Sequence, residues 1–304
     1  MPFSYLTYAD FLARHISGKV QKIAVDAGFT CPNRDGTLGT RGCAFCDNRS
    51  FVPPYCDPSD SISEQLRKGV DFFRRKYPAM RFLAYFQAHT NTYAPLPDLH
   101  RRYEEALSAD GVVGLVVATR PDCLPDDVLD LLADLSQRAF VQIEVGVETV
   151  HDRTLRLIGR GHDYACAADA IRRAAKYDLH VGIHMILGLP GETRNDILQQ
   201  AQTIAALPIE TLKLHQLQVL RRTPMERLYQ SNPKMFPTFT PQEYAALVLD
   251  YLAFIPPSVA IDRFLNQSPP GMLARPGWGL KNHEFTAILH NEAARRAHSH
   301  AADQ

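Results

Sequence analysis

The feature of this sequence that most constrains its fold is a regular alternation of short apolar runs and amphipathic stretches. The apolar runs predict strands at residues 22–26, 82–87, 112–119, 140–148, 179–187, 211–217 and 258–262. The amphipathic stretches predict helices at residues 61–76, 98–109, 125–137, 163–177 and 193–207. Strands that alternate with helices form a parallel sheet through right-handed crossovers. The pattern therefore predicts an α/β fold, namely a partial or near-complete (β/α) barrel of the TIM type.

The ends of the chain depart from this alternation. Residues 1–20 precede the first strand and are expected to form an N-terminal extension, while residues 21–220 form the core barrel. After residue 207 the pattern loosens, and two helices, near 225–230 and 241–254, precede a last strand, a Pro/Gly-rich stretch and a final helix. We expect residues 221–304 to be a C-terminal extension that packs on the barrel. Its last residues resemble a frayed tail, in which His298 and His300 are solvated.

Composition restricts where the protein works. Lysine plus arginine (33) equals aspartate plus glutamate (33), so no global field attracts the chain to nucleic acid or a membrane, although a local basic patch is compatible with this balance. The N-terminus lacks a signal peptide's apolar run, and no segment approaches the roughly 18 apolar residues of a membrane span. We expect a cytoplasmic protein. Six cysteines in a reducing compartment indicate metal or redox chemistry more than disulfides.

Three cysteines occupy the loop that follows the first expected strand. Cys31, Cys43 and Cys46 are spaced as C-x11-C-x2-C in a stretch rich in Gly, Asn and Asp. In a barrel, loops that follow strands build the active site. Three thiolates would leave one iron of a [4Fe–4S] cluster without a protein ligand, whereas structural zinc normally takes four ligands. Because Cys56 follows further along the chain, a zinc site of four cysteines also stays open.

The expected strand at residues 140–148 alternates in polarity. One face would carry Val141, Ile143, Val145 and Val147, and the other face would carry Gln142, Glu144, Gly146 and Glu148. Carboxylates on the face away from the helices indicate a ligand-filled barrel interior. The alternative is an edge strand whose polar face meets water.

At the cysteine loop the chain resembles the radical S-adenosylmethionine (SAM) superfamily, most closely its YhcC-type branch. The resemblance begins with AVDAGFTCPNRDGTLGTRGCAFCDNRSF, although the superfamily's commoner spacing is C-x3-C-x2-C. It continues through YFQAHTNTYAPL, TRPDCLPDDVLDLL, GRGHDYACAADA, HMILGLPGET, LKLHQLQV and RTPMERLY. Several of these strings are also similar to the radical SAM domain of the Elongator catalytic subunit. The resemblance implies a barrel of the radical SAM type.

The resemblance also implies an enzyme. Cys31, Cys43 and Cys46 would bind a [4Fe–4S] cluster, at which SAM is reductively cleaved to a 5′-deoxyadenosyl radical that acts on an unidentified substrate. An external flavodoxin- or ferredoxin-like protein would supply the electron. No membrane partner is implied. A zinc-stabilised binding module and an iron–sulfur electron carrier without catalysis remain as alternatives from other classes.

Further site residues follow from matched positions. Phe45 stands where the superfamily places an apolar residue near the adenine, with ordinary loop packing as the alternative. Gln87 ends a YFQ string where many relatives carry Gly-Gly-Glu for the methionine amino group. Gly188 and Gly191 in GLPGET would let the backbone approach the cofactor, although an ordinary strand-to-helix turn has the same pattern.

Charged and basic side chains complete the candidate site. Glu144 and Glu148 are expected to bind the ribose or amino group, with Arg120 and Arg160 as charge partners. The candidate catalytic residues are three histidines that would meet at the barrel mouth, although a lone buried histidine is usually a core residue: His162, His184 and His215. Asp262 and Arg263 would close the site after the last strand.

The sequence leaves two substrate classes open. Similarity to the Elongator domain favours tRNA, and basic runs at 67–68, 74–76, 172–173 and 221–222 would contact phosphates. At helical spacing such runs are more often a solvated face, which leaves a small metabolite as the other class.

Overall fold

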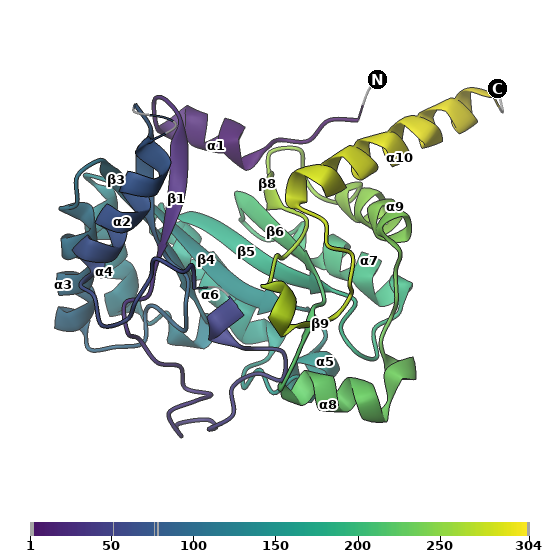
Figure 1. Ribbon diagram of the computed structural model, residues 1–304, viewed down its shortest axis with the longest axis horizontal. Coiled ribbons are helices and arrows are strands. Elements are labelled where there is room, and N and C mark those ends of the chain that lie inside the picture. The colour runs from purple at the N-terminus through teal and green to yellow at the C-terminus, as the bar shows by residue number, and fades with distance from the viewer. Residues whose placement is uncertain (1–2, 51, 76, 78, 303–304) are drawn as a thin grey trace.

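The computed structural model of the protein describes residues 3–50, 52–75, 77 and 79–302. Seven parallel strands, in the order β1-β2-β3-β4-β5-β6-β8, form one sheet that curls into an open half-barrel (Figure 1). The predicted α/β barrel is confirmed in its partial form. The strands are β1 (Val20–Val25), β2 (Arg81–Phe86), β3 (Val112–Thr119), β4 (Phe140–Glu148), β5 (His180–Leu187), β6 (Thr211–Gln216), β7 (Val219–Leu220), β8 (Ala260–Arg263) and β9 (Leu273–Arg275).

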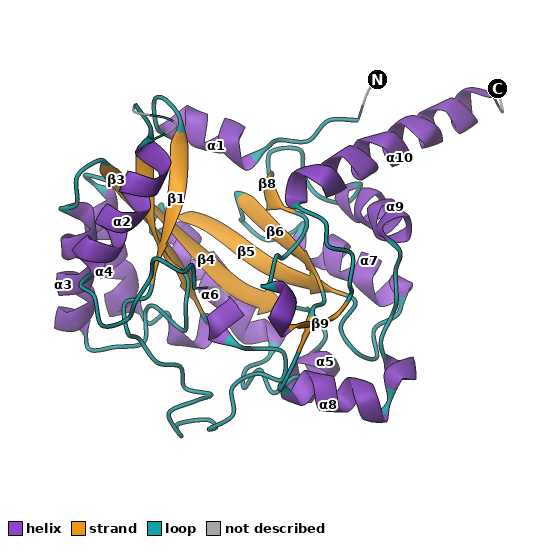
Figure 2. Ribbon diagram, in the orientation of Figure 1, coloured by secondary structure: helices purple, strands orange, loops and turns teal. Residues whose placement is uncertain are grey.

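Helices cover the convex face of the sheet and leave its concave face to loops (Figure 2). Most of them begin where the sequence offers a capping side chain, as Ser61, Asp163, Thr193 and Thr240 do for α2, α6, α7 and α9. The helices are α1 (Tyr8–His15), α2 (Ile62–Arg74), α3 (Leu96–Leu107), α4 (Asp126–Ser136), α5 (Asp152–Leu157), α6 (Tyr164–Lys176), α7 (Arg194–Ile204), α8 (Pro224–Ser231), α9 (Pro241–Leu252) and α10 (Asn282–Ala302).

The middle strand, β4, separates the two environments of the barrel. Its apolar residues, from Val141 to Val147, lie in the large core between sheet and helices. Its polar residues Gln142, Glu144 and Glu148 are buried on the other face. β4 pairs with β3 and β5, so the edge-strand alternative is wrong and the polar face lines the interior.

The N-terminal end of the barrel interior is closed by α1, a helix that the sequence reasoning missed. Tyr8, Phe11 and Leu12 pack into a second apolar cluster with residues of β1, β2, β3 and β8. The Tyr8 hydroxyl donates to Gln142 Oε1 at 2.6 Å. With this end covered, the cavity described below lies towards the carboxyl ends of the strands.

The segment after residue 220 contributes to the barrel itself. β8 pairs in parallel with β6 and so completes the sheet. β7 and β9 form a short antiparallel ribbon near α8, an element pair that the sequence did not suggest. The final helix runs through Ala302, and the expected frayed tail is therefore wrong as far as the described residues reach. Among the described residues, no helix is long and apolar enough to cross a membrane.

Candidate active site

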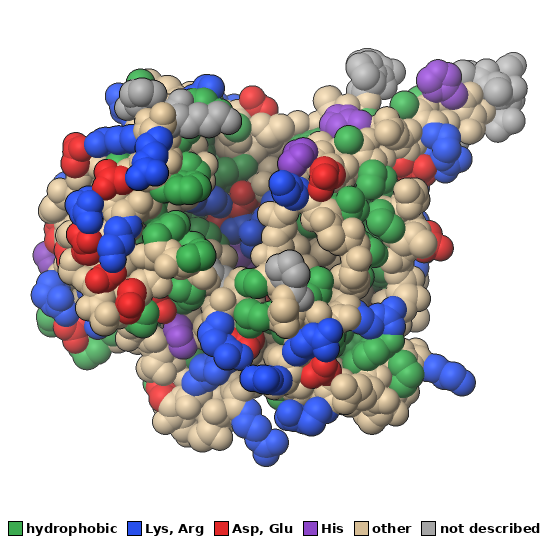
Figure 3. Space-filling model, in the orientation of Figure 1, with side chains coloured by type: hydrophobic (Ala, Val, Ile, Leu, Met, Phe, Trp, Pro, Cys, Tyr) green, Lys and Arg blue, Asp and Glu red, His purple; other side chains and the backbone are tan. Residues whose placement is uncertain are grey.

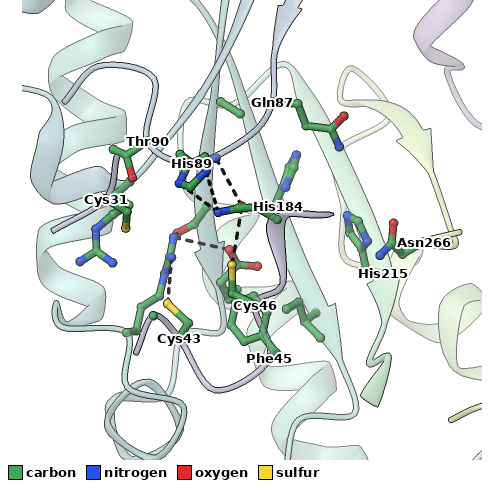
Figure 4. Close-up of a pocket in the computed structure, with 18 of the residues that line it drawn as sticks. Cys31, Cys43, Phe45, Cys46, Gln87, His89, Thr90, His184, His215 and Asn266 are labelled. Carbon is green, nitrogen blue, oxygen red and sulfur yellow. Dashed lines mark hydrogen bonds and ion pairs between the residues drawn. The ribbon is translucent and has the colours of Figure 1, made fainter. Parts of the chain in front are cut away.

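An open cavity lies at the carboxyl ends of the strands, where the concave face is hollowed (Figure 3). It holds about 1090 Å³ of empty space, part of which opens to solvent. A space of this size suits a cofactor-sized ligand. The three loop cysteines line one side, and His215 and Asn266 lie across from Cys31 on the other (Figure 4).

The cysteine loop is held by its own backbone and by two neighbouring segments. Cys46 N–H donates to the Cys43 carbonyl at 3.0 Å, which makes the tight turn that the C-x2-C spacing predicts. Ala44 N–H donates to the Ile158 carbonyl at 2.8 Å and its carbonyl accepts from Met225 N–H at 2.9 Å. The start of α8 and the end of α5 therefore fix the position of the thiols.

Each of two thiols receives hydrogen bonds from side chains behind it. Asn33 Nδ2 donates to Cys43 Sγ at 3.3 Å and Arg160 Nη1 donates to the same sulfur at 3.6 Å. Arg34 Nη2 lies 3.5 Å from Cys46 Sγ. Burial and the neighbouring Cys43 raise the pKa of Cys46 to about 11, and the Arg34 hydrogen bond partly offsets this. Such donors stabilise thiolates and tune the potential of a bound cluster.

Cys56 belongs to a different part of the molecule. It is buried, and its thiol donates to the Ala24 carbonyl at 2.9 Å. Burial raises the pKa of this thiol to about 12. Among the described residues, no three histidine, cysteine or carboxylate side chains converge on one point as the ligands of a single ion would. Because the Cys56 thiol is engaged with β1, a zinc site built from four cysteines is not favoured.

Glu144 is the centre of a buried polar network below the cavity. Its Oε2 accepts from the Tyr85 hydroxyl at 2.6 Å, from Lys213 Nζ at 2.7 Å and from His184 Nε2 at 2.9 Å. Lys22 Nζ reaches Oε1 at 3.3 Å. These lysines hold the pKa of Glu144 well below its usual range despite its burial. The charge partners of Glu144 are therefore lysines, and not the arginines that the sequence suggested.

The two lysines share a second carboxylate. Asp262 Oδ2 lies 2.7 Å from Lys22 Nζ and 3.0 Å from Lys213 Nζ. Both lysines occupy interior-facing positions of β1 and β6. The same alternation that exposed the polar face of β4 would have found them. Two carboxylates and two ammonium groups thus compensate one another inside the barrel.

The family of the chain follows from its match to known sequences. The model of the radical SAM superfamily matches residues 36–204, and the model of the radical SAM C-terminal domain matches residues 209–295. The chain belongs to the radical SAM superfamily. Enzymes of this superfamily use a [4Fe–4S] cluster and SAM, so the expected enzyme class and cofactors are confirmed.

Radical SAM relatives align over nearly the whole chain. The uncharacterized protein YtqA of Bacillus subtilis is 37% identical over 96% of this chain and 90% of that protein. Protein YhcC of Escherichia coli is 37% identical over 88% of this chain and 85% of that protein, which confirms the expected branch. A tRNA uridine(34) acetyltransferase of Dehalococcoides mccartyi is 28% identical over 56% of this chain and 36% of that protein.

A solved radical SAM structure shares the fold. The archaeal Methanocaldococcus infernus Elp3 superposes with a TM-score of 0.70, at 15% identity, over 92% of this chain and 64% of that one. At this identity the likeness shows the half-barrel fold alone.

The side chains around the cavity fit the two radical SAM cofactors. Phe45 lines the cavity beside the cysteines, and Gln87 enters it directly after β2 with no hydrogen bond from its amide among the described residues. Thr90 Oγ1 and Arg120 Nη1 line the same space and are buried without a partner. Buried polar atoms without partners mark places where a polar ligand restores hydrogen bonds.

Glu148 and Arg160 form a pair beside the cluster loop. Arg160 Nη2 lies 3.5 Å from Glu148 Oε1 and donates to the Gly146 carbonyl at 2.6 Å. A Cβ on Gly146 would lie 2.5 Å from Arg160 Nη2, so only glycine leaves room for the arginine. Burial raises the pKa of Glu148 although Arg160 opposes this. Arg160 therefore connects β4 to the thiol of Cys43.

The other expected residues divide between cavity and surroundings. His184 and His215 line the cavity, with ring centroids 5.4 Å apart. His162 is not part of its lining, and its Nδ1 contacts the Asp163 carbonyl at 3.0 Å. Gly188 and Gly191 have φ of 90° and 79° in the turn before α7, where a Cβ on Gly188 would meet Phe239 at 3.2 Å. These two glycines lie beside the site.

Proposed function

We propose that Cys31, Cys43 and Cys46 hold the [4Fe–4S] cluster and that this radical SAM enzyme acts on tRNA. The observation that carries the first part is that three thiols line one wall of a cavity, with basic and amide donors behind two of the sulfurs. Bound there, the cluster would supply the electron that cleaves SAM into methionine and a 5′-deoxyadenosyl radical.

The protein's own residues have three tasks in this proposal. Phe45 packs against the adenine, and Gln87 accepts from the amino group of SAM where relatives use glutamate. Glu148 of β4 and Arg160, which follows α5, fix the loop and bind polar groups of SAM. Glu144 holds His184 in position at the cavity. The closed end below α1 keeps water from entering through the barrel.

Support for tRNA comes from a group of arginines at the mouth of the cavity, here called the basic rim. Arg221 and Arg222 follow β7, Arg227 lies on α8 and Arg41 lies on the cluster loop; all four are exposed. Figure 3 shows basic side chains gathered over the cluster loop and α8. No ion pair joins them to a carboxylate among the described residues. Unpaired arginines beside a cavity suit a polyphosphate backbone.

Several residues of the other basic runs have their charges paired. Arg67 contacts Glu64 at 2.7 Å, Lys68 contacts Asp60 at 2.6 Å, and Arg173 contacts Asp126 at 2.8 Å. Lys76, the last residue of the 74–76 run, lies outside the described residues. The name of the Dehalococcoides relative supports the same substrate class, because that protein acts on tRNA. An external flavodoxin- or ferredoxin-like donor completes the proposed reaction.

The proposal is tested with anaerobically purified protein carrying a reconstituted cluster. We would measure 5′-deoxyadenosine formed from SAM, with dithionite as reductant, in the presence and absence of bulk tRNA. We expect tRNA to raise the rate several-fold and to gain a nucleoside of altered mass. If tRNA has no effect and a fraction of small metabolites stimulates the reaction, the substrate proposal is wrong while the enzyme class stands.

A further inference from the structure

The side of the cavity opposite the cysteines contains an arginine that makes no direct ion pair in the part of the chain that the structure describes. Arg263, the last residue of β8, lines the cavity, and its Nε is buried without a hydrogen-bond partner. No carboxylate lies within ion-pair distance of it among the described residues. The nearby carboxylates Glu144 and Asp262 are shared by Lys22 and Lys213.

Other buried arginines of the cavity do have carboxylate partners. Arg120 Nη2 lies 2.7 Å from Asp122 Oδ2, and Arg160 Nη2 lies 3.5 Å from Glu148 Oε1. A partly buried charge without a partner costs stability, and a bound anion would offset that cost. Arg263 thus differs from its neighbours in the way that a ligand-binding arginine does.

A register shift in the sheet directs Arg263 into the barrel. Leu212 of β6 pairs with Ile261, but Lys213 pairs with Arg263, which leaves Asp262 as an extra residue. Strict alternation would send Arg263 towards the helices, since Ile261 belongs to the outer core and Asp262 contacts interior lysines. Bulges of this kind redirect side chains next to active sites. Here both Asp262 and Arg263 face the interior.

Two histidines complete the surroundings of the guanidinium. Arg263 Nη2 donates to His215 Nε2 at 3.4 Å, which leaves the proton of neutral His215 on Nδ1. His184 donates from Nε2 to Glu144, which leaves its Nδ1 as an acceptor. The wall therefore offers a guanidinium, an N–H donor and an acceptor. A guanidinium with an adjacent N–H donor matches an oxyanion.

We propose that Arg263 and His215 bind an oxyanion of the substrate, a phosphate or carboxylate, and hold it across the cavity from the cluster. The inference adds a substrate subsite to the proposed function and relies on it only for the position of the reacting group. Anion binding itself can be measured without SAM cleavage, so the two fail separately.

The probe is radiolabelled inorganic phosphate, bound by anaerobic holoprotein in equilibrium dialysis. We expect one saturable site in the wild type and at least tenfold weaker binding in R263Q. R67Q, at an exposed arginine of α2 outside the basic rim, is the matched control and should bind like the wild type. An unchanged dissociation constant in R263Q, or no saturable binding by the wild type, would overturn the proposal.

Further variants and competitors make the result specific. R263K keeps a positive charge and should retain part of the affinity. H215Q should weaken binding several-fold, and it tests the site independently if R263Q fails to fold. Displacement of phosphate by bulk tRNA identifies a nucleotide phosphate as the source of the oxyanion, and displacement by small acids alone identifies a metabolite. Displacement by SAM at a stoichiometry of one would contradict the proposal, because the site would then hold the cofactor's carboxylate.

Discussion

At the scale of single residues, the barrel interior contains a network of buried charges around Glu144 and Asp262. Glu144 and Asp262 face Lys22 and Lys213, and His184 is held against this network by its bond to Glu144. A buried network of this kind is costly to break, because removing one member leaves another uncompensated. The network therefore positions His184: it fixes which atoms of this side chain face the cavity.

The titration of His184 should be visible in the stability of the metal-free protein. Burial and the positive charges of Lys213 and Arg263 lower the pKa of His184 to about 4, although Glu144 opposes this. The ring of His215 lies next to that of His184. Between pH 6.5 and 4 the unfolded chain binds a proton at this residue while the folded protein does not, so stability falls as pH falls. We expect His184 to contribute about 3 kcal/mol to that fall.

Urea unfolding of wild type and H184Q at a series of pH values measures this contribution. The variant should lose stability less steeply across this window, whatever its stability at neutral pH. Glu144 and Asp262 have lowered pKa values, and their titration also affects stability. They are present in both proteins, however, and they contribute only below the ordinary pKa range of carboxyl groups. Parallel curves for the two proteins would show that His184 is not the group that titrates.

At the scale of elements, the close contact between β3 and β4 restricts which residues fit at the centre of the sheet. Gly114 of β3 pairs with Phe140 of β4, and these strands meet closely enough that a side chain does not fit. This closeness brings β3 and β4 together at the centre of the sheet. The polar residues of β4 depend on that position.

We expect G114A to destabilise the protein by about 1–3 kcal/mol or more. A Cβ at this position would lie 2.2 Å from the Phe140 carbonyl oxygen, so one strand must move. G271A is the matched control, because a Cβ there meets nothing within 4 Å, and its effect should stay within about 0.5 kcal/mol. Thermal unfolding compares the stability of the two variants. Equal melting temperatures would contradict the expectation, because β3 and β4 would then move apart without a loss of stability.

The elements also show what a sequence can predict and why. Alternation predicted the seven strands of the sheet because each contains apolar residues, in a continuous run in β3 and alternating with polar residues in β4 and β6. It missed α1, whose apolar residues Tyr8, Phe11 and Leu12 are few and face the barrel rather than the outer core. The three cluster cysteines are a prediction from spacing, whereas the hydrogen bonds from Asn33 and Arg160 to Cys43 were not predictable from the sequence. These contacts join segments far apart in the chain, which local pattern does not encode.

The site of Arg263 illustrates the same limit. Sequence placed it at the end of the last strand, but the register shift that turns it inward depends on how β8 meets β6. Glu144 was correctly assigned to the interior, yet its lysine partners come from β1 and β6. Pairing across a barrel depends on tertiary geometry, so the residues were predictable and their partners were not.

At the scale of the whole molecule, equal numbers of acidic and basic residues conceal an uneven distribution. Arginines without carboxylate partners among the described residues gather at the cavity mouth, while basic residues of α2 are paired with nearby acids. A neutral protein can therefore present a local positive field at one opening. This arrangement favours an anionic macromolecule that approaches the site from the cluster-loop side.

The basic rim should determine how binding of tRNA depends on salt. The triple variant R221Q/R222Q/R227Q should bind bulk tRNA more weakly, and its slope of log affinity against log salt should fall by about one for each arginine that contacts a phosphate. The matched triple variant R67Q/K68Q/R74Q removes equal charge from α2, where each residue is paired with an acid. Filter binding at several salt concentrations compares them. Equal losses in the two variants would indicate an unspecific effect of net charge.

The central claim is that three cysteines hold a cluster that cleaves SAM. Its most direct test is the amount of 5′-deoxyadenosine formed from SAM by reconstituted protein under anaerobic reduction, in wild type, C46A and C56A. We predict that wild type and C56A bind iron and sulfide and form 5′-deoxyadenosine, because the Cys56 thiol donates a hydrogen bond to the Ala24 carbonyl and lies away from the cavity. C46A should lose both properties. Product formed by C46A at the wild-type rate, or a colourless wild type that binds zinc and refuses iron, would contradict the account.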